Sequence, residues 1–279
     1  MIRGEHQSRG GSSPIIRFIL GFFVMIGALI FLGCPLRMIL RLGGGDLNAL
    51  FGIAGFAGGI GFGTIFLKRG YSLQRTYALS KLESAMMPAI QVGLLVLVVT
   101  APAFIFFSQK GPGAMHAPWL ISLAAGLVVG GLSQFSRLCT VGGFRDLFLF
   151  KKSILIFGYL AVLVGVFLVN ISFGNFHLGF ENQPIAHADG LWNFLGMALA
   201  GFCSVLLGGC PLRQLIMTGE GNSDAAVTVL GLAAGAAFAH NFGLAASGAG
   251  PTLNGQIAVG IGFVVALIIA ILNTKRANA

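Results

Sequence analysis

Long apolar stretches recur along the whole chain, and they restrict its fold more than any other feature of the sequence. Each is about 18 or more residues long, which lets a helix cross roughly 30 Å of hydrocarbon. They lack the alternation of apolar and polar residues that strands of a membrane β-barrel show. Only 9% of the residues are charged, too few to keep the surface of a soluble protein in water. The sequence therefore predicts an all-α, polytopic membrane protein.

Glycine, proline and charged residues divide the apolar stretches into eight predicted transmembrane helices. These spans lie near residues 15–33, 48–67, 85–107, 118–138, 153–174, 191–208, 225–247 and 255–273. Eight spans place all the strongly basic connectors on one side of the membrane; they are residues 1–17, 68–81, 137–152 and 275–276. Lysine and arginine are enriched in cytoplasmic connectors. We therefore expect an inner (cytoplasmic) membrane protein with both termini in the cytoplasm.

The net charge of +9 would suggest nucleic-acid binding in a soluble protein. Here the basic residues lie in short connectors, without a basic stripe interleaved with aromatic residues, so the lipid bilayer is the expected partner and nucleic acid is not. The four cysteines have neither C-x-x-C nor zinc-ligand spacing. Glycine clusters such as residues 58–63 lack the Gly-Lys-Ser/Thr of a nucleotide loop. We expect no metal or cofactor, and close helix packing at these glycines.

An internal repeat relates the two ends of the chain. The sequence Gly-Cys-Pro-Leu-Arg occurs at residues 33–37 and again, without a gap, at residues 209–213. The shift that brings Cys34 onto Cys210 also superposes further identical residues: Gly43, Gly45, Gly55, Gly59 and Phe62 meet Gly219, Gly221, Gly231, Gly235 and Phe238. Five spans separate equivalent points, so the copies should have opposite orientations. Such inverted repeats place a substrate site near the membrane midplane, between broken helices.

The repeat also organises the domain. We expect one integral membrane domain over residues 1–279, with repeat one at about 15–110 and repeat two at about 191–273. Linking helices at about 118–174 join the two copies.

Each copy of the motif places a cysteine at a predicted helix break. Proline restricts the residue before it, so a helix should end at Cys34 and at Cys210 and restart with proline in its first turn. The new N-terminus offers free N–H groups and partial positive charge to an anion. Arg37 and Arg213 follow about one turn later. We expect each of these arginines either to face a polar cavity or to form an ion pair. The acids available for pairing are Asp46, Glu220 and Asp224.

A third element, residues 136–146, again places a thiol, Cys139, between two arginines, Arg137 and Arg145. It either lines the substrate path or is a basic cytoplasmic connector. Cys203 lies inside an apolar stretch, where a thiol usually serves as a small hydrophobic side chain. We leave it out of the predicted site.

Three further polar residues are possible site members. Arg41 lies in a connector on the predicted outer side, where an arginine is easier to explain if it faces a pore. His240 and Asn241 interrupt the seventh predicted span. Polar groups at that depth are either functional or hydrogen-bonded to a neighbouring helix, and the sequence leaves both open.

Three stretches together resemble the YeeE/YedE family of membrane transporters. They are the doubled Gly-Cys-Pro-Leu-Arg, the run Gly-Gly-Gly-Asp-Leu-Asn-Ala-Leu at residues 43–50, and residues 136–146. The resemblance covers nearly the whole chain. The family includes thiosulfate uptake proteins and a branch assigned to selenium metabolism. The resemblance implies an hourglass-shaped helical protein with short helices entering the membrane, a narrow path lined by Cys34, Cys139 and Cys210, and a TusA-like cytosolic sulfur carrier as a partner.

The sequence therefore predicts a transporter, and not an enzyme, for a small sulfur- or selenium-containing anion. The predicted path consists of Cys34, Arg37, Cys139, Cys210 and Arg213. A membrane thiol–disulfide oxidoreductase is the alternative, with Cys34 and Cys210 forming a reversible disulfide, although electron transfer does not need the duplicated arginine. A third possibility, a membrane subunit that only assembles a larger complex, leaves the repeated thiols unexplained.

Overall fold

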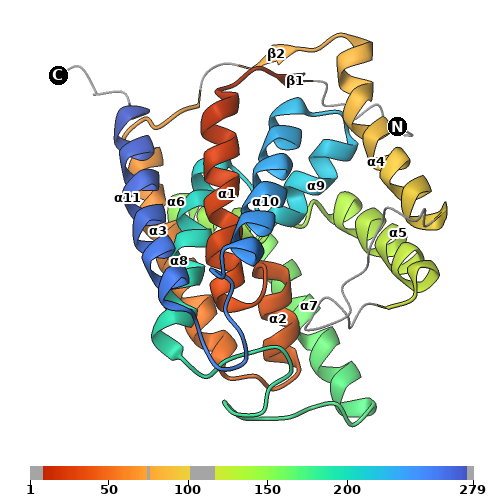
Figure 1. The fold of residues 1–279 in the computed structure, drawn as a ribbon, viewed down its shortest axis with the longest axis vertical. Helices are drawn as coiled ribbons and strands as arrows, with labels where there is room; N and C mark the ends of the chain where they lie inside the picture. The colour runs from red at the N-terminus through yellow and green to blue at the C-terminus, as the bar shows by residue number, and fades with distance from the viewer. Residues whose placement is uncertain (1–8, 74–75, 101–116, 275–279) are drawn as a thin grey trace.

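The computed structural model describes residues 9–73, 76–100 and 117–274, which are almost entirely helical (Figure 1). The helices are α1 (Pro14–Phe31), α2 (Pro35–Gly43), α3 (Asn48–Lys68), α4 (Lys81–Thr100), α5 (Trp119–Ser136), α6 (Thr140–Phe150), α7 (Ile154–Ser172), α8 (Gly190–Leu207), α9 (Pro211–Gly219), α10 (Ser223–Asn241) and α11 (Leu253–Leu272). Two short strands, β1 (Arg9–Gly10) and β2 (Tyr77–Ala78), pair antiparallel. The prediction of an all-α protein is confirmed.

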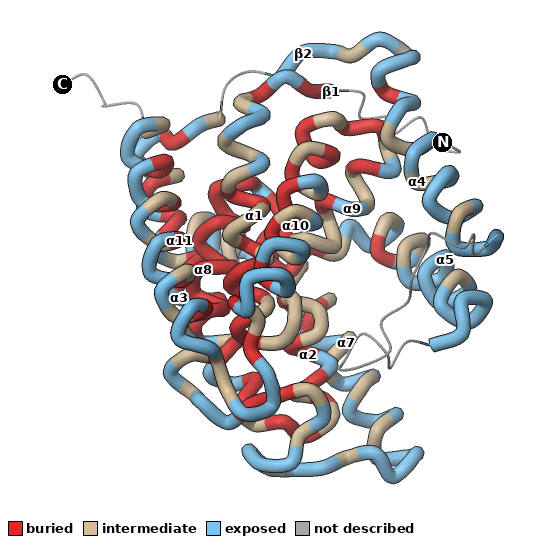
Figure 2. Tube along the Cα trace, in the orientation of Figure 1, coloured by how far each residue is buried: buried red, intermediate tan, exposed pale blue. Residues whose placement is uncertain are grey.

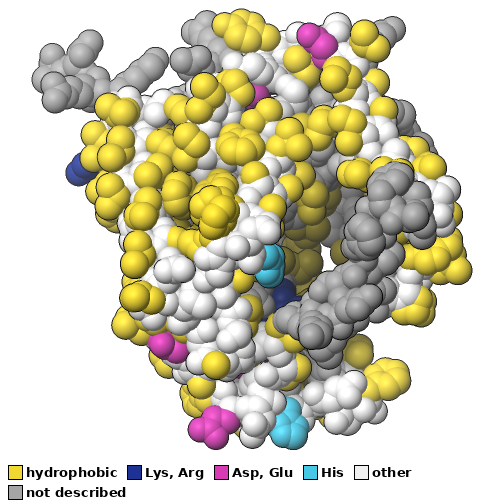
Figure 3. Space-filling model, in the orientation of Figure 1, with side chains coloured by type: hydrophobic (Ala, Val, Ile, Leu, Met, Phe, Trp, Pro, Cys, Tyr) yellow, Lys and Arg dark blue, Asp and Glu magenta, His cyan; other side chains and the backbone are white. Residues whose placement is uncertain are grey.

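Eight helical segments within the described residues are long and apolar enough to cross a membrane. Three of them are broken and combine a long helix with a short one: α1 with α2, α5 with α6, and α8 with α9. The other five are α3, α4, α7, α10 and α11. Large hydrophobic side chains cover much of the described surface, as a protein in lipid requires (Figure 3). The predicted multi-pass architecture with additional short helices is confirmed.

Two predicted span boundaries differ from the structure, and another span is continued by a short helix. The third span starts earlier, at Lys81, where Ser80 and Glu83 form a reciprocal capping pair; its predicted end at 101–107 lies outside the described residues. The fourth span breaks after Ser136 and continues as α6. The seventh ends at Asn241, and Gly243 follows with a φ of 64°, a left-handed conformation that cannot continue a helix.

The two copies of the repeat pack across each other. α1 lies along α10 and α3 lies along α8, while α1 and α8 meet in the centre. The same glycines make both contacts, because a Cβ added at Gly55 would collide with the Phe194 carbonyl and one added at Gly231 with the Phe18 carbonyl. Phe18 and Phe194 are themselves equivalent in the repeat. The glycine clusters therefore serve close helix packing, as predicted.

The copies are inverted. His187, three residues before α8 begins, hydrogen-bonds the Ile30 carbonyl in the last turn of α1. The end of α1 thus lies beside the start of α8, and the two helices run in opposite directions (Figure 1). α8 is the most buried helix, enclosed by its neighbours (Figure 2). Cys203 lies on α8 in this core and is fully buried.

The two described ends of the chain lie at the same end of the helix bundle. β1 pairs with β2 in the connector between α3 and α4. The same connector meets the last described residues, because Tyr71 bridges Thr274 and the Ser72 N–H donates to the Asn273 carbonyl at 3.2 Å. An even number of membrane crossings places the ends in this way.

Candidate functional site

The three broken spans share one backbone design, although the third has a different sequence. Each long helix ends in a left-handed residue, at Leu32 (φ 62°), Arg137 (φ 53°) and Gly208 (φ 83°). The following N–H donates to the carbonyl five residues earlier: Gly33 to Ala28 (2.8 Å), Leu138 to Ser133 (3.0 Å) and Gly209 to Ser204 (3.1 Å). This is a Schellman termination, and the chain leaves each helix in the same direction.

In each break a cysteine then caps the N-terminus of the short helix. Cys34 caps α2, Cys139 caps α6 and Cys210 caps α9, each with extended backbone angles. The Cys139 sulfur accepts a hydrogen bond from the Gly142 N–H at 3.3 Å, whereas the other two thiols cap no N–H of their own helix. Three helix N-termini, each with partial positive charge, thus carry a cysteine at the N-cap position.

The thiols of Cys139 and Cys210 meet. The two residues share one buried cluster, and their sulfur atoms are hydrogen-bonding neighbours, with Thr140 beside the Cys210 sulfur. Cys34 is partly exposed. Tyr159 of α7 lies within electrostatic range of both Cys34 and Cys210. The structure therefore brings the third cysteine element into the region of the duplicated motif, away from the basic connector that was its alternative location.

The two equivalent arginines have different surroundings. Arg213 donates to the Gln134 side chain at 3.1 Å and lies 3.9 Å from a carboxylate oxygen of Glu220. Arg37 has neither an ion pair nor a hydrogen bond among the described residues, and its Nε atom is buried. Its side chain lies along Gly33, next to Cys34, because a Cβ added at Gly33 would lie 2.9 Å from Arg37 Cδ. An incoming anion can therefore neutralise the guanidinium of Arg37 beside Cys34.

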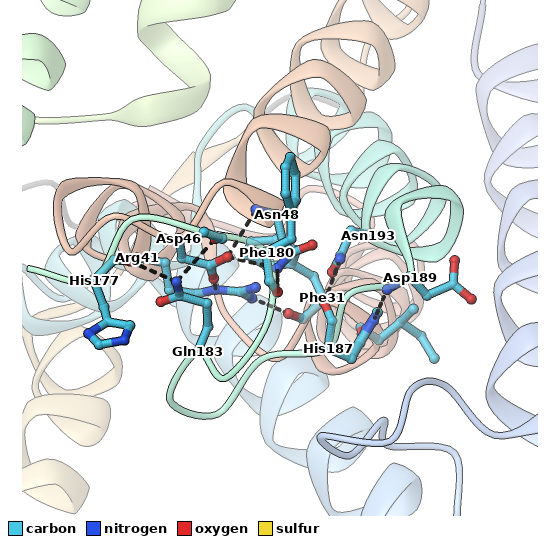
Figure 4. Close-up of polar contacts among 12 residues, drawn as sticks. Phe31, Arg41, Asp46, Asn48, His177, Phe180, Gln183, His187, Asp189 and Asn193 are labelled. Atoms are coloured by element: carbon cyan, nitrogen blue, oxygen red, sulfur yellow. Dashed lines mark hydrogen bonds and ion pairs between the residues drawn. The ribbon is translucent and has the colours of Figure 1, made fainter.

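Arg41 does not face a pore, which corrects the expectation from the sequence. Its Nε atom donates to Asp46 at 2.6 Å, and the guanidinium stacks on Phe31 at 4.0 Å from the ring centre and donates to the Phe31 carbonyl (Figure 4). Asp46 also accepts from the backbone and side-chain N–H groups of Asn48, both at 2.9 Å. A neutralised arginine thus holds the end of α1, just before the Cys34 break.

The loop before α8 also stabilises the end of α1. The His187 Nε2–H donates to the Ile30 carbonyl at 2.7 Å, and its Nδ1 accepts from the Asp189 N–H at 3.3 Å (Figure 4). Burial lowers the pKa of His187, which favours this neutral tautomer. The Ala246 N–H reaches the Leu29 carbonyl at 3.2 Å. Long-range partners therefore satisfy the last three carbonyls of α1, and no local sequence signal could reveal them.

The remaining candidates take no part in the contact between the Cys139 and Cys210 thiols, although Arg137 is only two residues before Cys139. Arg145 pairs with its neighbour Asp146 at 2.9 Å and lines a cleft of about 400 Å³ beside the end of α8, together with Arg17 and Tyr71. Arg137 is exposed at the break between α5 and α6. His240 and Asn241 form the exposed end of α10, where the helix stops. The amide of Asn241 donates to the carbonyl of Ala237 in its own helix.

Comparison with known proteins identifies no relative: neither a family model nor a curated protein matches this chain. The fold defines the class, an all-α multi-pass membrane protein. Any more specific function has to be argued from the site itself. Within the described residues, no group of three or more histidine, cysteine, aspartate and glutamate side chains could hold a metal ion.

Proposed function

We propose that this protein transports a small sulfur- or selenium-containing anion through the membrane, along Cys34, Cys139 and Cys210. The observation that supports this proposal best is the convergence of three cysteine-capped helix N-termini, with the unpaired Arg37 beside one of them, Cys34. Helix N-termini and an unpaired guanidinium attract an anion, and thiols are polarizable groups that suit sulfur or selenium. Several weak sites in series allow the ion to enter and to leave.

The resemblance of the cysteine motifs to the YeeE/YedE family supports the same substrate class. Thiosulfate and selenium species are both candidates on that ground. The resemblance also suggests that a small TusA-like sulfur carrier receives the product in the cytosol. In such a pathway the protein would move the anion without chemical change and would not act as an enzyme.

One observation favours the rival proposal, a thiol–disulfide oxidoreductase. The thiols that meet are those of Cys139 and Cys210, and not the Cys34–Cys210 pair that the repeat suggested. A disulfide requires a sulfur–sulfur bond of about 2.05 Å, so Cys139 and Cys210 are the pair to test. Electron transfer, however, gives no reason for an unpaired arginine beside Cys34.

Uptake into vesicles that contain the purified protein separates the two proposals. We expect radiolabelled thiosulfate or selenite to enter these vesicles and not protein-free ones. Cys34→Ser should slow uptake, because a hydroxyl is a harder and less polarizable group than a thiol. Cys203→Ser is the matched control, because Cys203 lies in the core helix α8, away from the other three thiols.

Alkylation of the cysteines during turnover shows whether a disulfide forms, which is the result that would contradict transport. With thiosulfate as the anion, since selenite itself oxidises thiols, transport predicts that Cys139 and Cys210 stay as free thiols while the anion accumulates. A disulfide that forms and breaks between these two cysteines, without anion flux, would reject the transport proposal and support electron transfer.

We further propose that the chain lies in the cytoplasmic membrane with both termini in the cytoplasm. The basic residues Arg9, Lys68 and Arg69 lie at the same end of the bundle as the described chain ends. The connector before α8 lies at the opposite end and carries Glu181 and Asp189 without lysine or arginine. A reporter fused after Ala279 should be cytoplasmic, and one inserted within residues 175–182 should be external. The same location for both reporters would contradict this topology.

A further inference from the structure

Apart from the sulfur of Cys210, a weak acceptor beside Thr140, two buried hydroxyl groups near the thiols have no hydrogen-bond partner among the described residues. They are Oη of Tyr159 and Oγ1 of Thr140, whose residues are only 7% and 2% exposed. A buried polar group without a partner destabilises the fold by about 1–3 kcal/mol, so native proteins contain few of them. Two near the same thiols leave hydrogen-bond donors that a bound ligand can use.

Both hydroxyls belong to the surroundings of the three cysteines. Thr140 is the first residue of α6, directly after Cys139, and it is a neighbour of the Cys210 sulfur. Tyr159 packs in the same cluster as Cys139 and Cys210, with its ring edge-on to Phe144 at 5.8 Å. It lies in electrostatic range of Cys34 as well.

Helix packing places Tyr159 next to the short helices. α7, which carries Tyr159, packs against α2 and α6, so it touches the short helices capped by Cys34 and Cys139. Neither hydroxyl belongs to the duplicated motif, and both come from the linking helices between the repeats. The linking helices therefore contribute polar atoms to the centre of the site and do more than join the two copies.

Other buried polar atoms without partners exist, so burial is not sufficient to define a binding group. Tyr71 is equally buried and its hydroxyl is equally unpartnered, but it lies near Arg17 and Cys203 at the cleft beside α8. Tyr159 and Thr140 differ from it because they adjoin Cys210 and because the buried Nε of Arg37 also lacks a partner near Cys34. Donors of this kind suit the oxygen atoms of an anion.

We infer that Tyr159 and Thr140 bind the oxygen atoms of the transported anion while the thiols contact its sulfur or selenium atom. This inference rests on the proposed transport function and narrows its substrate to an oxyanion, such as thiosulfate or selenite. An oxyanion has several acceptor oxygens, and each hydroxyl can donate one hydrogen bond to them. Neutral donors add affinity without a further fixed positive charge, which lets the anion leave again.

Removal of the hydroxyls tests the inference in the vesicle assay with radiolabelled thiosulfate and selenite. Tyr159→Phe and Thr140→Val keep the shape of each side chain but delete the donor. We expect KM for the anion to rise roughly tenfold in each variant, because a hydrogen bond to a charged group is lost, with little change in the maximal rate. Thr140→Ser should restore the wild-type KM.

Tyr71→Phe is the matched control, since it deletes a hydroxyl of equal burial away from the three thiols, and it should leave KM unchanged. Thermal unfolding of every variant shows whether the fold is intact, and the Thr140 pair decides the question if Tyr159→Phe does not fold. Wild-type vesicles that take up neither anion would reject the proposed function. Wild-type uptake with an unchanged KM in Tyr159→Phe and Thr140→Val would overturn only this inference.

Discussion

Arg37→Gln should raise KM for the transported anion roughly ten- to a hundredfold, because it removes a charged hydrogen-bond donor worth about 1.5–3 kcal/mol. Arg37 has no partner among the described residues, so its full charge is available to the substrate. Glutamine keeps a polar side chain of similar reach and loses the charge. Uptake of radiolabelled thiosulfate and selenite into vesicles, measured over a range of concentrations, gives KM and the maximal rate.

Arg213→Gln is the natural comparison, because the repeat makes Arg213 the equivalent of Arg37. Its guanidinium already interacts with Gln134 and Glu220, so its removal should change KM less than that of Arg37. It should lower thermal stability more, since it leaves Glu220 without its cation. Equal effects of the two substitutions on KM would show that the difference in pairing has no functional meaning.

Gly59→Ala should prevent the native packing of α3 on α8. A Cβ at Gly59 would collide with the backbone carbonyl of Ala198, and a backbone atom inside a helix cannot rotate away as a side chain can. Inserting a methyl group into a packed interface destabilises by about 1–3 kcal/mol and sometimes more. Here both helices belong to the central contact between the repeats, so we expect a large fall in Tm and in the yield of folded protein in detergent.

Gly58→Ala is the control for this effect, because it makes the same change one residue earlier in the same helix. The closest atom to a Cβ at Gly58 is Phe194 Cζ, at 3.8 Å, which is an ordinary contact. Its Tm should stay close to that of the wild type or rise slightly, since alanine favours a helix more than glycine. Equal loss of stability in Gly58→Ala and Gly59→Ala would contradict the close approach of α3 and α8.

The two copies of the repeat make equivalent helix-packing contacts, but the ends of α1 and α8 have different surroundings. Gly59 and Gly235 occupy equivalent positions, and both meet a backbone carbonyl of the other copy, at Ala198 and Phe22. At the breaks, by contrast, the end of α1 is covered by the loop that carries His187, whereas the end of α8 lines the cleft with Arg17 and Tyr71. The two faces of the protein therefore differ although their helices are related.

Features that depend on local composition and spacing can be predicted from the sequence. Apolar length predicts the membrane helices because hydrocarbon excludes unpaired backbone groups over a known thickness. Proline after Cys34 and Cys210 predicts two of the helix breaks, because it restricts the residue before it. The equivalent glycines in the two copies predict a repeat, and the five spans between equivalent points predict its inversion; the structure shows these glycines in equivalent contacts.

The contacts between polar groups, by contrast, depend on how the helices pack. The break before Cys139 has neither glycine nor proline, and Arg137 adopts its left-handed conformation against its intrinsic preference. The local sequence also does not show that Asp46 neutralises Arg41, or that Tyr159 of a linking helix lies near Cys34 and Cys210. These contacts join residues on different helices, so they depend on how the helices pack and not on the propensity of any one segment.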